Sequence, residues 1–568
     1  MTTYSATPLV ETTAALPEEW AARLTTVDVD TRANLPALAT LRFRDPNHQL
    51  LSSSGIAIGT PLKVSADTTA DSRPVVLFSG EVAGVASEVE EQGTFTVLRA
   101  YDRAQRLTRG RRLTAWQETT LEKVVRDIAS HAALGVGSVA GSTSKIKYLV
   151  QPNITDWEFL QYLAELHGAV VVVNNGTLFL KALQSADSAP DPRQAGDDNP
   201  YVLSYGTNLL SLQVAVGSPG PAGEVQVRGW NIDTKKATVG TAKVDGSKYI
   251  DIGTRAGYLA TKLGGGAFTE VIGTGYALQG DVKGVAEYFA DTAAAAIVDL
   301  EATVYGSPHL TAGTPVTLVN VGEPFTGRYT VTGTRHVFDR GYRTKVNVSS
   351  QQRVPHAARN GPAAYAVPGL AIGTVQDVRD PDTRQSGAVR IAFPWLSEDY
   401  VSDWARTVQF GGEGGGGVIS PGIGDEVLVG FEQGRLDRPY VLGGLYNGKD
   451  HPSTHSVDLI DADSKAVNRR SLSSREGNRI ELLDHPDEGG VLLSTGDQEV
   501  KIRLDRKAKK ITIEAENLEL KGTKSLTLTT DSLEIGDNTK SSLKLNAKTV
   551  EINGTDSVKI ASPKVDVG

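Results

Sequence analysis

A few stretches of the chain hold polar residues of the types and spacing that binding chemistry needs. Residues 412–417 read Gly-Glu-Gly-Gly-Gly-Gly and formally match the GxGxxG fingerprint of dinucleotide-binding sites. That chemistry requires the loop to open a helix, whose first N–H groups meet the pyrophosphate. Here Pro421 and a predicted strand follow instead. We therefore interpret the stretch as a loop, and no cofactor is expected.

Two histidines, His451 and His455, lie four residues apart, the spacing at which a helix presents both to one metal ion. Pro452 argues against a long helix, and no Glu follows the first histidine. The chain has no Cys, which excludes thiolate metal sites, disulfides and cysteine nucleophiles. Both histidines are interpreted as loop residues, and no metal site is expected.

An acidic cluster follows, with Asp484, Asp487 and Glu488 around His485. Glycosidases place two carboxylates on either side of a cleft, so this cluster is where a cell-wall-degrading activity would be sought. The polar stretch 451–498 around it is short for an inserted enzyme domain. No GxSxG, HExxH or phosphate-loop motif occurs in the chain. A solvated turn is favoured, and no catalytic residue is assigned.

Charge argues against a nucleic-acid partner. The 568 residues carry 58 Lys and Arg against 67 Asp and Glu, which gives a formal charge of −9. General nucleic-acid binders are basic. Trp395, Tyr400 and Trp404 are able to stack on bases, but Asp399 and Asp403 lie among them. A structural role is predicted for these aromatic residues.

The N-terminal segment has no basic residue before Arg23, and nowhere do 18 apolar residues follow one another. We therefore expect neither a signal peptide nor a membrane helix, and synthesis in the cytoplasm. The length favours three or four domains.

The elements that must position these residues are mostly strands. Up to residue 367, strands alternate with a few helices. Leu121, Val124, Val125 and Ile128 are spaced as one apolar stripe of a helix. Thr155 opens a capping box with Glu158, and that helix is expected to end at Gly168.

Further elements are predicted in the same region. A hairpin is expected over 170–180 because Asn-Asn-Gly separates two apolar runs. A third helix is expected over 284–298. Residues 184–200, rich in Pro, Asp and Ser, are predicted to form an exposed loop between two β units.

Residues 370–447 have a different sequence pattern. Five strand candidates separated by Gly-rich turns suit a small closed barrel of the oligonucleotide/oligosaccharide-binding (OB) type. These candidates cover 373–378, 388–393, 404–410, 425–432 and 439–445. A polar connector with a hairpin candidate at 479–483 follows.

The last 70 residues carry the clearest signal, because pairs of aliphatic residues one position apart recur every seven to ten residues. A fixed period of short strands marks a β-helix, but two side chains per rung are too few to fill a coil of one chain. Three chains wound round a shared axis would bury them, with a rod of roughly 40 Å for nine rungs. The predicted trimer core comprises Leu518, Leu520, Leu526, Leu528, Leu533, Ile535, Leu543, Leu545, Val550, Ile552, Val558 and Ile560.

The barrel segment resembles the valine-glycine-repeat protein G (VgrG) spikes, which combine the hub and needle of contractile phage tails in one chain. The resemblance covers residues 373–448 and is most specific in Pro-Gly-Ile-Gly-Asp-Glu-Val-Leu-Val-Gly-Phe-Glu at 421–432. Residues 101–112, 154–168 and 312–344 resemble the hub of the same family in the same order.

The expected fold class is therefore mainly β. A tandem β-barrel hub with inserted helices is expected over 1–367, an OB-fold barrel over 368–450, a connector over 451–498, and a trimeric triple-stranded β-helix needle over 499–568. The resemblance implies tail-tube and baseplate proteins as partners of the hub, effector cargo, and a PAAR-type tip protein. We expect that tip protein to dock on Val565, Val567 and Gly568, where strand edges stay open.

The function expected from this resemblance is that of a homotrimeric central spike. It would adapt the tail tube of a contractile injection system to its tip and puncture the target envelope mechanically, without enzymatic activity. Two alternatives stay open. A spike with cell-wall-degrading activity predicts that Asp484 and Asp487 face a cleft, and a trimeric receptor-binding fibre predicts glycan or cell-surface binding by the C-terminal half.

Overall fold

The computed structural model describes residues 6–141, 145–193, 199–217, 222–231, 235–262, 268–273, 282–349, 369–380, 386–536, 543–559 and 564. The chain divides into two compact units, Met1–Leu445 and Tyr446–Gly568. Strands hold 42% of the residues and helices 13%, which confirms the mainly β class. Each unit is described by itself.

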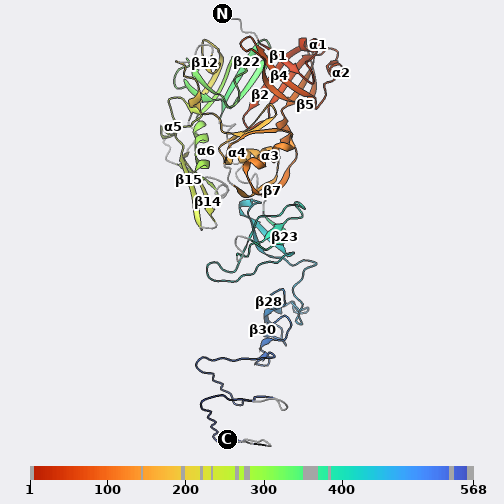
Figure 1. Ribbon diagram of the computed structural model, residues 1–568, viewed down its shortest axis with the longest axis vertical. Coiled ribbons are helices and arrows are strands. Elements are labelled where there is room, and N and C mark those ends of the chain that lie inside the picture. The colour runs from red at the N-terminus through yellow and green to blue at the C-terminus, as the bar shows by residue number, and fades with distance from the viewer. Residues whose placement is uncertain are drawn as a thin grey trace. The chain divides into compact units, whose positions relative to one another are not determined.

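A ten-stranded sheet organises the first unit (Figure 1). Each strand pairs with its neighbours antiparallel. In sheet order the strands are β1 (Ala6–Glu11), β4 (Pro61–Thr68), β5 (Val75–Glu90), β6 (Gly93–Tyr101), β3 (Leu38–Arg44), β2 (Leu24–Arg32), β21 (Gly333–Phe338), β22 (Tyr342–Ser349), β18 (Val298–Tyr305) and β13 (Leu209–Val216).

One face of this sheet is apolar because side chains in register point to the same side. A row across five strands joins Leu98, Leu41, Val27, Phe338 and Tyr342, all of them buried. Helices α1 (Glu18–Ala22) and α2 (Leu50–Ser54) contribute to the core at the β2–β6 end. Helix α6 (Val282–Ala295) contributes to a second core with β18 and β22.

The part of the chain between β6 and β12 (Val202–Ser204) forms a separate layer. Helix α3 (Leu121–His131) buries the four predicted stripe residues, and α4 (Asp156–Leu166) starts with the predicted Thr155–Glu158 capping box. Gly168 adopts a left-handed φ of 61°, as expected at a helix end. The hairpin prediction is confirmed by β10 (Val170–Asn174) and β11 (Thr177–Lys181), which pair antiparallel.

Two expectations for this region need correction. The third helix ends at Ala295, since Val298 already begins β18. The segment 184–200 is not simply an exposed loop, because Ala186 and Ala189 are buried; its residues 194–198 lie outside the described part. The strands before and after this segment share one sheet, because β2 pairs with β21.

The remaining elements of the first unit are short. They include a two-stranded ribbon of β7 (Arg112–Thr119) and β9 (Ile146–Ile154), which pair antiparallel. The others are η1 (Arg103–Thr108), β8 (Gly135–Val139), η2 (Ala186–Ser188), β12 (Val202–Ser204), β14 (Ala222–Asn231), β15 (Lys236–Lys243), β16 (Ile250–Asp251), α5 (Ala256–Lys262), β17 (Phe268–Gly273), β19 (Pro315–Val319) and β20 (Gly327–Thr330).

The predicted five-stranded barrel is present. Its sheet runs β24 (Arg390–Ala392), β23 (Leu370–Asp377), β26 (Glu426–Phe431), β27 (Pro439–Gly444) and β25 (Arg406–Thr407). A bridge between Val389 and Ala405 connects the two ends of that order and closes the barrel. Tyr148 and Val150 of β9 pack into the barrel core, and the Tyr148 hydroxyl donates to the carbonyl oxygen of Val401 at 2.7 Å. The β7–β9 ribbon thus contributes to the barrel core.

The second unit begins with an antiparallel meander, drawn in blue in Figure 1. Its strands are β28 (Arg469–Ser473), β29 (Arg479–Leu483), β30 (Gly490–Ser494), β31 (Lys501–Asp505) and β32 (Lys510–Glu514), paired in sequence order. The hairpin candidate at 479–483 is therefore a strand of this sheet. The first two aliphatic pairs of the predicted needle also lie in it, where β31 and β32 pair within one chain.

A buried histidine in the first unit gives a pH prediction. His336 accepts a hydrogen bond from the Tyr342 hydroxyl at Nδ1 (2.9 Å) and donates from Nε2 to the Leu310 carbonyl (3.1 Å), so it is neutral. Burial lowers the pKa of His336 from 6.5 to about 4. Below pH 6.5 the His336 imidazole binds a proton in the unfolded chain, whereas in the folded chain it stays neutral down to about pH 4. The contribution of neutral His336 to the free energy of unfolding is therefore fully present above pH 6.5 and is lost as the pH falls.

We predict that the first unit loses about 3 kcal/mol of unfolding free energy through His336 between pH 6.5 and 4. Denaturant unfolding of wild type and His336→Asn, followed by tryptophan fluorescence across that range, measures the effect. The difference between the two proteins should shrink as the pH falls. A difference that stays constant would contradict the neutral, buried assignment.

Candidate assembly surface

The meander of the second unit exposes a continuous apolar face. Leu472, Ile480, Leu493, Ile502 and Ile513 lie in register across its five strands. A second row on the same face joins Leu482, Val491, Leu504 and Ile511. We call these two rows the apolar face.

The side chains of this face are solvent-accessible in the single chain. Val491 is half-buried, and the exposed fractions of the other eight side chains run from 38% for Leu493 and Ile502 to 69% for Ile511. Monomeric proteins rarely expose a contiguous apolar patch of this kind, and such patches mark sites of association. Covering one such aliphatic side chain completely stabilises by about 1.5–3 kcal/mol. The face is therefore a candidate assembly surface.

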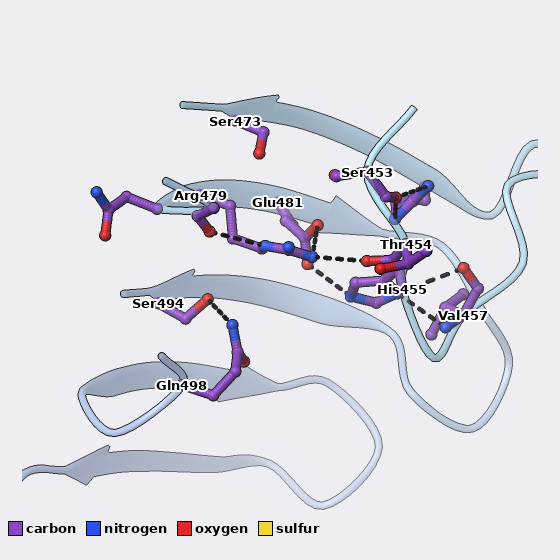
Figure 2. A network of polar contacts seen from close by, with 12 residues as sticks. Ser453, Thr454, His455, Val457, Ser473, Arg479, Glu481, Ser494 and Gln498 are labelled. Atoms are coloured by element: carbon purple, nitrogen blue, oxygen red, sulfur yellow. Dashed lines mark hydrogen bonds and ion pairs between the residues drawn. The ribbon is translucent and has the colours of Figure 1, made fainter. Parts of the chain in front are cut away.

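Part of the opposite face of the same sheet, at β28 and β29, is covered by the segment that precedes it. Arg469 of β28 donates to the carbonyl oxygen of Ser453 (3.3 Å), and Arg479 of β29 donates to that of Thr454 (3.3 Å). Figure 2 shows how the segment lies against the strands. We call residues 453–457 the strap.

A buried contact between His455 and Glu481 fastens the strap. His455 Nε2 lies 2.7 Å from an Oε2 of Glu481 that is completely inaccessible to solvent, and Arg479 Nη1 lies 3.6 Å from the other oxygen (Figure 2). The Val457 N–H donates to His455 Nδ1 at 2.8 Å, which places the imidazole proton on Nε2, toward the carboxylate. The Arg479 guanidinium supplies the positive charge beside this buried carboxylate.

This network was missed at the level of the sequence. The sequence predicts only a loop position for His455. Glu481 alternates with Ile480 and Leu482 along a strand, a pattern that predicts an exposed polar side chain. The loop assignment itself is confirmed, but only 8% of the His455 side chain is exposed. No local pattern shows that a loop 26 residues upstream covers Glu481. His451, by contrast, is exposed.

The acidic cluster lacks the arrangement that glycoside hydrolysis needs. Asp484 pairs with Arg470 (2.6 Å), and Asp487 pairs with Lys507 (2.5 Å); both carboxylates are more than half exposed. The hydrogen bond from Lys507 lowers the pKa of Asp487, whereas a general acid needs a raised one. The prediction of a solvated turn is confirmed.

The other sites considered from the sequence have structural roles. Trp395 donates from Nε1 to the Ile372 carbonyl (2.6 Å), Tyr400 is buried in the barrel core, and the Arg390 guanidinium lies over the Trp404 ring. The glycine loop at 412–417 opens no helix. Among the described residues no three His, Asp or Glu side chains gather as a metal site, and no helix is long and apolar enough to cross a membrane.

The predicted needle core is solvent-exposed in the single chain. No strand is formed over the described residues after Glu514. Exposed fractions of the predicted core residues run from 48% for Val550 to 67% for Ile552. Ile560, Val565, Val567 and Gly568 lie outside the described residues. The assignment of a shared core and of a tip-docking end stays a prediction.

Comparisons with known proteins agree with this architecture. A family model described as the Alg8 N-terminal domain matches residues 12–339, and one described as the type VI secretion system/phage-baseplate injector OB domain matches residues 371–446. The second match coincides with the barrel.

Curated relatives match over shorter stretches. The type VI secretion system spike protein VgrG5 of Pseudomonas aeruginosa is 41% identical over 71 residues, 12% of this chain and 9% of that protein. VgrG4b of the same organism is 35% identical over 109 residues, 18% of this chain and 13% of that protein. The matches thus span less than a fifth of either relative.

A solved structure, the lidded PdpA–VgrG complex of Francisella, contains a chain that aligns over 90% of this chain and 80% of its own, with a TM-score of 0.52 and 9% identity. That likeness shows a shared fold. The barrel sequence and the overall fold are therefore similar to those of VgrG spike proteins of the type VI secretion and phage-baseplate type. Since the first family model covers more than half of the sequence, the chain belongs to the family of the Alg8 N-terminal domain.

The strap leads to a prediction about the buried pair. His455→Leu leaves the Glu481 carboxylate buried without its nearest polar partner, so the meander should lose about 3–5 kcal/mol. The double variant His455→Leu with Glu481→Leu removes both groups and should recover most of that loss. Hydrogen exchange of the β29 amides in the full chain measures the stability of both variants. Tryptophan fluorescence would not report on the meander, because every Trp lies before residue 405.

Asp484→Asn provides the control, since the exposed Asp484–Arg470 pair contributes at most about 1 kcal/mol. Equal losses for the single and double variants would contradict a specific contact between His455 and Glu481.

Proposed function

We propose that the chain is the homotrimeric central spike of a contractile injection system. Its hub would adapt the tail tube to the tip, and its C-terminal part would puncture the target envelope mechanically. One observation carries the proposal: the single chain leaves both the apolar face and the regularly spaced aliphatic pairs after it exposed to water.

Three copies offer a way to cover those side chains. Each rung after β32 contributes only two aliphatic residues, which is too few to close a coil of one chain but enough for a coil shared by three. The apolar face would meet its counterparts at the start of the same axis. Backbone hydrogen bonds shared between chains would then stiffen the needle, because no chain can leave without exposing all its rungs.

The partners follow from the same arrangement. Tail-tube and baseplate proteins would bind at the hub, and a PAAR-type tip protein would bind at Val565, Val567 and Gly568. The spike would also carry effector cargo. We propose that the spike is made in the bacterial cytoplasm and becomes part of a tail-like particle.

The proposed role is mechanical and non-enzymatic. Two features support it: the curated relatives are named as spike proteins, and Asp484 and Asp487 are exposed and paired with cations. Zymography on peptidoglycan with the wild-type chain tests this part. Clearance that disappears in an Asp484→Asn, Asp487→Asn double variant would replace the mechanical account with an enzymatic one.

The shared core gives a direct prediction. Leu528→Asp would place three carboxylates on the needle axis, and burying unpaired like charges costs several kcal/mol. We expect this variant to lose its heat-resistant trimer in mass photometry and native electrophoresis. Thr527→Asp, one residue away and predicted to point outward, is the matched control and should stay trimeric.

A Leu528→Asp chain that still forms a heat-resistant trimer would contradict the shared core. So would equal effects of the two substitutions.

A further inference from the structure

Residues 99–112 of the first unit are rich in arginine and contain no lysine. The stretch has one acidic residue, Asp102, and it is buried. The whole chain has a formal charge of −9, so this cationic stretch is a local exception. All its arginines are exposed, and we call them the arginine patch: Arg99, Arg103, Arg106, Arg109, Arg111 and Arg112.

The 3-10 helix η1 sets three of these side chains in one row. A 3-10 helix has three residues per turn, so side chains three positions apart lie one above the other, with a rise of roughly 6 Å per turn. Arg103 and Arg106 are related in this way. Arg109 extends the row, because its backbone N–H donates to the Arg106 carbonyl oxygen at 3.3 Å.

The opposite side of η1 is fixed in the core. Ala104 and Leu107 are buried in the cluster that α3 and α4 also build. The Asp102 carboxylate caps the helix and accepts hydrogen bonds from the N–H groups of Ala104 (3.0 Å) and Ala37 (3.0 Å). The arginine row therefore faces outward from a firm support, and little ordering is needed when a ligand binds.

Most donors of the row are still available. Glu81 of β5 lies 3.7 Å from Arg103 Nε and also pairs with Arg106. The side chains of Arg103 and Arg106 nevertheless remain 47% and 40% exposed. Arg109 makes no ion pair or side-chain hydrogen bond within the described part of the chain. Each guanidinium carries five N–H donors, so one carboxylate leaves much of the row unsatisfied.

The chemistry of the row favours an acidic polypeptide. Guanidinium groups, unlike lysine ammonium groups, bind carboxylates and phosphates through two parallel hydrogen bonds. Single-stranded nucleic acid also needs exposed aromatic rings for stacking, and residues 82–120, all of them described, expose no aromatic side chain. The acidic chain would in addition repel a long polyanion. A short run of Asp or Glu on a partner meets only the row.

We infer that Arg103, Arg106 and Arg109 bind an extended acidic segment of another protein, with its carboxylates at alternate positions. Alternate side chains of an extended chain point to one side and lie roughly 6.6 Å apart. That spacing matches the rise of roughly 6 Å between the arginines. Adjacent carboxylates would point to opposite sides. The contact goes beyond the proposed spike function, because it requires no particular number of chains.

Fluorescence anisotropy of labelled peptides with the full chain tests the site. The peptide Ser-Glu-Ser-Glu-Ser-Glu-Ser has alternate carboxylates, and Ser-Ser-Glu-Glu-Glu-Ser-Ser has the same charge without that spacing. We expect the alternating peptide to bind more tightly. Arg106→Gln with Arg109→Gln should weaken its binding about tenfold, because charge-assisted hydrogen bonds are lost. Arg106→Lys with Arg109→Lys keeps the charge but loses the planar fork, and should weaken binding about threefold.

The matched control is Lys509→Gln with Lys510→Gln. It removes the same charge from two exposed lysines that have no ion pair among the described residues, and should leave binding unchanged. Equal losses in the control and the Arg→Gln variant, unchanged binding by the Arg→Lys variant, equal affinity for the two peptides, or no binding would each overturn the inference. So would tighter binding of a DNA tetranucleotide of equal charge. All these outcomes leave the proposed homotrimeric spike intact.

Discussion

Apolar side chains that one chain cannot cover are the constraint on which this structure depends. In the meander of the second unit, nine aliphatic residues line one face of a sheet whose other face is partly covered by the strap, at β28 and β29. Further along, aliphatic pairs recur without any strand partner in the described part of the chain. Water is a poor environment for both, and the proposed trimer would bury them.

The buried charges of the second unit acquire a role under this constraint. A five-stranded sheet has two faces, and the proposed trimer requires that a defined one stays free. Glu481 is costly to bury without partners, and its contacts with His455 and Arg479 hold the strap on the other face. The first unit shows the same division, with a continuous apolar face and an opposite face that carries ion pairs such as Asp30–Arg32 and Glu301–Lys345.

Much of the fold could be predicted from local patterns. The helix stripe from Leu121, the Thr155–Glu158 capping box and the five barrel strands depend on residues close in sequence, and all are present. What could not be predicted depends on contacts between distant segments. The pairing of β2 with β21, separated by some 300 residues, merges two expected β units into one sheet, and the ribbon residue Tyr148 completes the barrel core. The His455–Glu481 pair was missed for the same reason.

The account therefore stands on the number of chains in the particle. Mass photometry of the purified full-length protein measures that number most directly. The account predicts a single dominant species at three times the 60.3 kDa mass of one chain, persisting on dilution. A monomer with a folded second unit would contradict it, because those aliphatic side chains would then be stable in contact with water.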